Sequence, residues 1–137
     1  MEAKKDFYNL VDEICRKDAR YKEDAYEFLM QGLYFTQSRL KRQGHIRGAE
    51  LVEGLRDLAV EKYGPMAKTV LHHWGIRQTR DFGNIVFNMI DKKILSKTEE
   101  DSIDDFNEVY DFEKAFENLI RQNIIRALKN GTNKDER

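Results

Sequence analysis

Residues 79–95 read TRDFGNIVFNMIDKKIL, and this stretch decides the fold class. Its apolar residues recur at spacings of three and four positions and cover more than half of a helical wheel. The clear polar strip that is left consists of Asn84, Asn88 and Asp91. We therefore predict a helix from Phe82 to Leu95 that is buried on several sides and forms the core of a mainly α fold.

Helical patterns also precede this stretch. Apolar residues at three- and four-residue spacing predict longer helices over residues 4–18, 22–42 and 49–64. Gly64 ends the third of these, and Pro65 fits the first position of a short helix leading to Trp74, because an N–H there has no intrahelical partner. Thr79 is the expected cap of the core helix. No period of about 20 to 50 residues repeats, so a solenoid is not expected.

The pattern changes after the core helix. Residues 94–97 (ILSK) and 108–112 (EVYDF) are short alternating runs, which predict a two-stranded β-ribbon. The acidic loop 99–105 would lie between the two strands, and a further helix is expected to close the chain. The predicted fold class is therefore mainly α: a compact single helical domain over residues 1–130, with one short β-ribbon and a winged-helix-like second half. Residues 131–137 are expected to form a flexible polar tail.

Composition limits the classes of function. The chain has 137 residues, of which 40% are hydrophobic and 36% charged, as expected of a helical protein with a charged exterior. Its 24 Lys and Arg residues are matched by 25 Asp and Glu residues, so no overall positive field attracts nucleic acid or an anionic membrane. The single cysteine, Cys15, has no internal disulfide partner, and neither a signal sequence nor an apolar membrane span is evident. These features predict a cytoplasmic protein without membrane contact.

Two turns carry local clusters of basic residues. These clusters are the candidate contacts for an anion or a nucleic acid, and their members are Arg39, Lys41, Arg42, His45, Arg47, Arg77 and Arg80. A helix starting near Gly48 would add backbone N–H groups to the first cluster. In a winged helix the third helix would enter the major groove, but Asp91 and the acidic loop would face phosphate with the wrong charge. Ordinary DNA reading by that face is therefore not expected.

The stretch GPMAKTVLHHWGI, residues 64–76, contains two adjacent histidines. Neighbouring residues lie about 100° apart on a helix, so His72 and His73 do not converge on one metal ion. On the helical wheel His72 lies opposite the apolar arc, and His73 lies at its border. We therefore expect a solvated His72 and a buried Trp74.

His45, Glu50 and Glu53 are the remaining candidates for acid/base or metal chemistry, because all three lie near one helix start. The two glutamates fit equally as first-turn acids that favour the positive end of the helix dipole, and we prefer this interpretation. The acidic loop lacks the glycine and the closing glutamate of a calcium-binding loop. No nucleophile elbow, phosphate loop, dinucleotide fingerprint or Cys-x-x-Cys pair is present. We predict no catalytic residues, no metal and no cofactor.

Four segments of the chain resemble a known family: RYKEDAYEFL, HIRGAELVEGLRDLAVEKYGPMAKTVLHHWGI, TRDFGNIVFNMIDKKILSKTEEDS and DFNEVYDFEKAF. They are similar to a family of small conserved hypothetical proteins described mainly from planctomycete and verrucomicrobial bacteria. The similarity spans about Ala19 to Phe116, and the chain departs from the family mainly in a longer C-terminal helix. The resemblance implies a compact single domain in a bacterial cytoplasm, and it implies no catalytic or binding residues.

These observations favour a non-enzymatic cytoplasmic interaction or adaptor domain that acts through protein–protein contacts, with another protein or with itself. Its basis is a strong core, balanced charge and the lack of a catalytic motif. The alternative is a nucleic-acid-associated, winged-helix-like domain that uses the basic turns 39–47 and 77–80.

Overall fold

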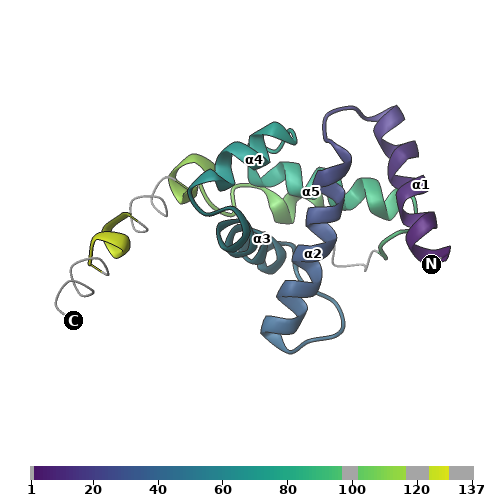
Figure 1. Cartoon of the computed structure of the whole chain (residues 1–137). Helices are drawn as coiled ribbons and strands as arrows, with labels where there is room; N and C mark the ends of the chain where they lie inside the picture. The colour runs from purple at the N-terminus through teal and green to yellow at the C-terminus, as the bar shows by residue number, and fades with distance from the viewer. Residues whose placement is uncertain (1, 97–101, 117–123, 130–137) are drawn as a thin grey trace.

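The computed structural model describes residues 2–96, 102–116 and 124–129. Within these residues the chain is mainly α and contains no β-strand. The named elements are α1 (Glu2–Lys17), α2 (Glu23–Leu40), α3 (Gly48–Tyr63), η1 (Gly64–Met66), α4 (Ala67–His73), α5 (Thr79–Asp91) and η2 (Ile103–Phe106), where η denotes a 3-10 helix. Residues 112–116 and 124–129 are also helical. In Figure 1, α2 stands between α1 on one side and α3 and α4 on the other.

The prediction that the helix from Phe82 to Leu95 forms the core is confirmed. Phe82 and Ile85 of α5 are fully buried, and the helix contacts α1, α2, α3 and η2. It ends at Asp91 and not at the predicted Leu95, because the backbone of Lys93 is left-handed, with a φ of 60°, and redirects the chain. The apolar residues after this turn pack against the core from outside the helix.

The helices α2 and α3 pack closely at Gly32. The fully buried side chain of Leu55 fills the space that a Cβ on Gly32 would need. On α3, Gly54 leaves the same room for Thr36, whose Oγ1 donates a hydrogen bond to the carbonyl oxygen of Gly32 at 2.7 Å. The two glycines therefore set how closely the helices approach.

The predicted β-ribbon is absent from the described residues, and the prediction is wrong there. Residues 92–95 and 107–110 form turns and bends, and residue 112 begins a helix, so neither predicted run is a strand where the structure describes it. The helix η2 lies in the predicted acidic loop between the two runs. Ser102 caps η2: its Oγ accepts the N–H of Asp104 at 3.2 Å, and the Asp105 carboxylate accepts the N–H of Ser102 at 3.1 Å. These local bonds satisfy backbone N–H groups at the start of η2. The described residues therefore contain no wing; residues 97–101 lie outside them.

The short helix η2 packs against the first turns of α3 and α5. The buried ring of Phe106 lies against Gly48 and Gly83, which leave it room because they have no side chain. Thr79 Oγ1 donates a hydrogen bond to the carbonyl oxygen of Phe106 at 2.6 Å and accepts the N–H of Val109 at 3.3 Å. Thr79 is thus the first residue of α5 and holds the segment after η2, instead of capping the helix as predicted.

Gly64 and Pro65 lie in η1, and α4 follows. The sequence predicts this break and a short helix after it. Trp74 follows α4 and is 8% exposed. Its ring centroid lies 5.5 Å from that of Phe28 and 5.8 Å from that of Tyr63. The prediction of a buried Trp74 is therefore confirmed, and its ring contacts join the end of α4 to the core.

The prediction of a solvated His72 is wrong. Its ring stacks on Phe112, with centroids 5.8 Å apart and an interplanar angle of 17°. Its Nε2 lies 3.4 Å from Glu113 Oε1. The helical residues 112–116 cover this side of α4. A helical wheel of α4 alone does not show this contact, because it includes only the residues of that helix.

No helix among the described residues is long and apolar enough to cross a membrane. The predicted tail, residues 131–137, lies outside the described part, as do residues 117–123 of the expected last helix. The helical residues 124–129 extend away from the body formed by the other helices (Figure 1).

Candidate functional site

The first basic turn follows the C-terminus of α2. Lys41 adopts a left-handed backbone with a φ of 53°, and its N–H bonds to the carbonyl oxygen of Ser38 at 3.2 Å. The N–H of Arg42 bonds to the carbonyl oxygen of Gln37 at 2.9 Å. These bonds close the helix, as is common for a left-handed C-terminal residue, and both basic side chains are exposed.

Acidic residues of α3 neutralise two of the predicted anion contacts. Arg39 forms an ion pair with Asp57, and Arg42 Nη1 lies 2.8 Å from Glu50 Oε1. Glu50 also accepts the N–H of Arg47 at 3.0 Å, which confirms its predicted place as a first-turn acid of α3. The Arg42 side chain lowers the pKa of Glu50 below its ordinary value.

The other three members of the first basic turn lie on the surface. Lys41, His45 and Arg47 are exposed, and the ion pairs among the described residues include neither Lys41 nor Arg47. Glu53 is exposed on α3, and Glu50 is bound by Arg42 and by the N–H of Arg47. Among the described residues, no group of three or more His, Cys, Asp or Glu side chains is placed to hold a metal ion.

An apolar pocket of about 170 Å³ lies beside this turn. Its walls come from α2, the loop before α3, the first turn of α3, α5, the residues that follow α5, and η2. The lining residues are Leu33, Gln37, Gly44, His45, Ile46, Gly48, Leu51, Val86, Phe87, Ile90, Leu95, Ser96 and Phe106. The sequence pattern does not reveal this pocket, because its walls are far apart in the chain.

The second basic turn does not join the first. Arg80 Nη1 donates a hydrogen bond to Asn107 Oδ1 at 2.7 Å and lies 3.6 Å from Asp104 Oδ1. Arg77 is exposed, and its backbone N–H is bound by the Asp81 carboxylate at 2.8 Å. Because η2 packs on the first turns of both α3 and α5, its acidic residues lie between the two basic turns.

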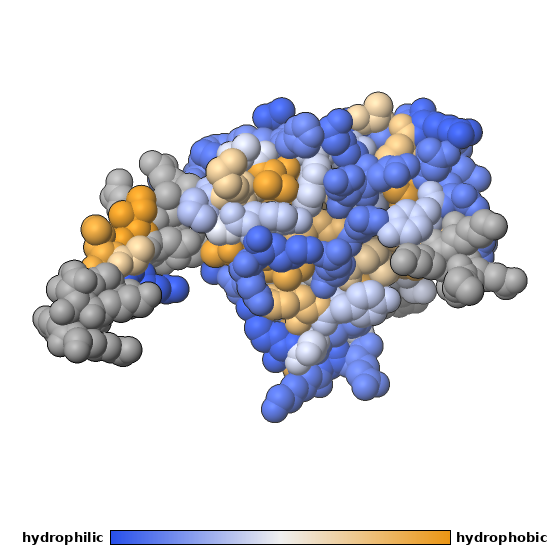
Figure 2. Space-filling view, in the orientation of Figure 1, coloured by the Kyte–Doolittle hydropathy of each residue, from blue (hydrophilic) through white to orange (hydrophobic). Residues whose placement is uncertain are grey.

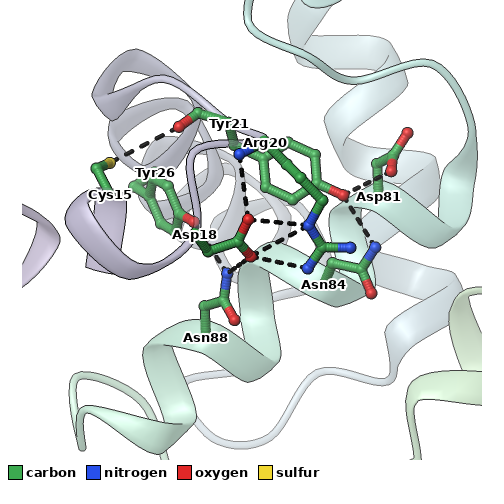
Figure 3. A network of polar contacts seen from close by, with 8 residues as sticks. All are labelled: Cys15, Asp18, Arg20, Tyr21, Tyr26, Asp81, Asn84 and Asn88. Atoms are coloured by element: carbon green, nitrogen blue, oxygen red, sulfur yellow. Dashed lines mark hydrogen bonds and ion pairs between the residues drawn. The ribbon is translucent and has the colours of Figure 1, made fainter. Parts of the chain in front are cut away.

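The polar strip of α5 faces the connection between α1 and α2 (Figure 3). Asn88 Nδ2 donates to Asp18 Oδ2 at 2.9 Å and to the Tyr26 hydroxyl at 3.1 Å. Asn84 Nδ2 donates to the Tyr21 hydroxyl at 2.9 Å. Two of the three side chains that a groove-reading helix would present to DNA are therefore used inside the fold. Sequence reasoning missed this network, although polar residues on an otherwise apolar helix are a signal for it.

Arg20 and Asp81 complete the network of Figure 3. The Asp18 carboxylate accepts from Arg20 Nε at 2.9 Å and Arg20 Nη2 at 2.7 Å, and this contact holds the pKa of Asp18 well below its ordinary value. Asp81 Oδ1 accepts the hydroxyl of Tyr21 at 2.6 Å. Burial raises the pKa of Tyr21, and it raises the pKa of Tyr26 to about 12.

The nearby thiol of Cys15 donates to the carbonyl oxygen of Tyr21 at 3.7 Å, and burial raises its pKa as well. At neutral pH the two phenols and this thiol are therefore protonated. The Tyr21 hydroxyl and the Cys15 thiol donate hydrogen bonds, and the Tyr26 hydroxyl accepts one from Asn88. The network holds the α1–α2 connection on α5, and it contains no activated nucleophile.

The helical residues 124–129 present the most concentrated apolar surface. Ile124 is 56% exposed, Ile125 47% and Leu128 68%. Seven large apolar side chains are exposed among the described residues, and three of them lie in this six-residue segment. On a helix these three positions fall within an arc of about 100°. Figure 2 shows the apolar surface on the segment that projects from the body.

No family model, no curated protein and no solved structure matches this chain. The resemblance to the small bacterial family therefore stays a prediction.

Proposed function

We propose that the chain is a non-enzymatic interaction domain that binds a protein partner through the apolar face of its C-terminal helical residues. The observation that carries the proposal is the exposure of Ile124, Ile125 and Leu128 on one side of a helix. Exposed apolar patches with a polar border are typical of surfaces that bind other proteins. A short amphipathic helix that lays its apolar face into a groove is a common mode of recognition.

The free energy gained by burying this apolar face indicates how stable the complex is. Complete burial of an exposed Ile or Leu side chain contributes roughly 1.5 to 3 kcal/mol. Because the three side chains are already about half buried, a partner gains roughly 2 to 5 kcal/mol from covering them. Association itself costs several kcal/mol, so this face alone gives a weak complex. Neighbouring polar contacts must add to it.

The charged residues of this segment indicate which polar group the partner needs at the edge of its groove. Lys129 lies about 90° around the helix from the centre of the apolar face, whereas Arg126 lies nearly opposite that centre. A partner with an apolar groove and an acidic group on the Lys129 side would complement both features. We keep a second copy of the chain as the alternative partner, and the cytoplasmic location and the bacterial family as predictions.

A nucleic-acid-associated function is less well supported. Arg39, Arg42 and Arg80 each have an acidic partner, and phosphate would have to displace these carboxylates. Asn84 and Asn88 bond to the two tyrosines of the network. If the chain does bind nucleic acid, the logarithm of its affinity falls steeply with the logarithm of salt concentration.

Site-specific photo-crosslinking in the cells that naturally express the chain tests the proposal. The photoreactive residue p-benzoylphenylalanine is placed at position 125 or 128, on the apolar face, or at position 126, on the opposite side. The proposal predicts a discrete protein adduct from positions 125 and 128 and none from position 126. Equal adducts from all three positions, or none from any, would contradict it.

A further inference from the structure

The apolar pocket beside the first basic turn suggests a ligand site that is separate from the C-terminal helix. We propose that this pocket binds a small carboxylate whose apolar part has the size of a phenyl ring. The proposal rests on the volume of the pocket, the chemistry of its walls and the charge of its surroundings. It goes beyond the proposed protein–protein function and does not depend on it.

The volume of the pocket sets the size of the apolar group. A cavity of about 150 Å³ lined by Leu, Ile and Phe side chains is large enough to bind benzene. This pocket has a volume of about 170 Å³. Leu33, Leu51, Val86, Ile90 and Phe106 supply walls from α2, α3, α5 and η2. A phenyl ring or a branched alkyl group of similar size therefore fits.

The surroundings of the pocket set the charge of the ligand. Gln37 lines the pocket and also lines a second, open hollow of about 350 Å³, whose other residues include Lys41 and Arg42. Arg47 lies in the chain between Ile46 and Gly48, which both line the apolar pocket. Two acids near this group are already engaged: Glu50 is bound by Arg42 and by the N–H of Arg47, and Asp105, which lies against Gly48, accepts the N–H of Ser102. Lys41 and Arg47 thus supply positive charge that complements a carboxylate.

The same charge argues against the most obvious protein occupant, the C-terminal helical segment of a second copy. Residues 124–129 include Arg126 and Lys129 and no acidic residue. Docking this segment would place two cations beside Lys41 and Arg47. A carboxylate has the opposite sign and avoids this repulsion.

Titration of the full chain with three matched probes tests the proposal. The probes are 3-phenylpropionate, the neutral 3-phenylpropan-1-ol and propionate, which lacks the ring. Binding is followed by two-dimensional amide NMR and calorimetry. We expect 3-phenylpropionate to bind at least tenfold more tightly than either other probe, with the largest shifts at the amides of Gly44, Gly48 and Leu51. Equal affinity for the acid and the alcohol, shifts centred elsewhere, or no binding at millimolar concentration would overturn it.

Variants separate the two parts of the site. Replacing both cations, Lys41→Gln with Arg47→Gln, is expected to weaken the acid about tenfold and to leave the alcohol unchanged. The matched control is Lys22→Gln with Lys114→Gln, which removes the same charge from exposed positions elsewhere. An equal loss in the control pair would show that net charge, and not this site, binds the acid.

A second pair of variants tests the pocket itself. Leu33→Trp fills the pocket from α2 and is expected to abolish binding of both phenyl probes. Its control is Tyr34→Trp at the next, exposed position of the same helix, which should bind normally. Circular dichroism confirms that each variant is folded. Unchanged binding by a folded Leu33→Trp variant overturns the proposal, and so does the appearance of a dimer that excludes 3-phenylpropionate.

Discussion

Replacing Gly75 with alanine is expected to be among the most destabilising single changes in the chain. Gly75 follows the buried Trp74 and has a φ of +96°, where side chains are rarely accommodated. A Cβ at this position would overlap the carbonyl oxygen of Arg20 and lie 3.2 Å from its carbonyl carbon. The same junction includes a hydrogen bond from the N–H of Lys22 to the carbonyl oxygen of Trp74, at 3.2 Å.

The magnitude is the sum of two effects. Holding a residue other than glycine in a sparsely populated backbone region costs about 1 to 3 kcal/mol. Overpacking a well-packed site costs a further 1 to 3 kcal/mol or so, and here the overlapping atom is backbone, which cannot rotate away. Gly75→Ala should therefore lower the free energy of unfolding by about 2 to 6 kcal/mol.

Two other glycines provide matched controls for these effects. Gly64 also has a positive φ, +52°, but open space surrounds its Cβ position. Gly64→Ala should therefore cost only the backbone part, about 1 to 3 kcal/mol. Gly44 has open space and no positive φ, so Gly44→Ala should change the free energy of unfolding by about 0.5 kcal/mol or less.

Urea unfolding followed by circular dichroism measures the three free energies under the same conditions. The reasoning predicts the order Gly75, Gly64, Gly44 from the largest loss to the smallest. If Gly75→Ala is no less stable than Gly64→Ala, the close approach of the α1–α2 connection to this turn is refuted.

Trp74→Ala should lower the free energy of unfolding by about 3 to 5 kcal/mol, measured in the same urea assay, because it empties a buried aromatic site. Tyr21→Phe should cost about 1 to 3 kcal/mol, since it removes the hydroxyl partner of Asp81, whereas the exposed Tyr34→Phe control should cost almost nothing. The pKa of Asp18 is lowered in the folded chain, so its stabilising effect is present above the ordinary carboxyl pKa and is lost as pH falls below about 4. Asp18→Asn should therefore unfold less steeply between pH 4 and pH 2, as followed by circular dichroism; an unchanged pH profile would contradict this role.

The core helix could be predicted from the sequence because the buried face of a helix requires apolar residues at a regular spacing within one segment. Phe82 and Ile85 recur at helical spacing, and the structure buries both. The end of α5 was missed, since Ile94 continues the apolar period from outside the helix. Alternation over four or five residues is a weak signal, and both runs form turns, bends or helix where the structure describes them. The capping bonds of Ser102 and Asp105 favour η2 in the stretch predicted to be the acidic loop.

The candidate sites were harder to predict, because their partners come from distant parts of the chain. The cluster of Arg39 and Arg42 is visible in the sequence, but the acids that neutralise them lie on α3. His72 stacks on Phe112, forty residues further along the chain. The pocket is likewise formed by segments that only the folded chain brings together.

The central claim is that the apolar face of residues 124–129 binds a protein partner. Its most direct test is the affinity, by calorimetry, of the purified full chain for the partner that the crosslinks identify. We expect Ile124→Gln with Leu128→Gln to weaken this binding at least tenfold, which corresponds to about 1.4 kcal/mol or more. The opposite-face control Arg126→Gln should change the affinity less than twofold. An unchanged affinity for the double variant, or an equal loss for the control, would contradict the claim.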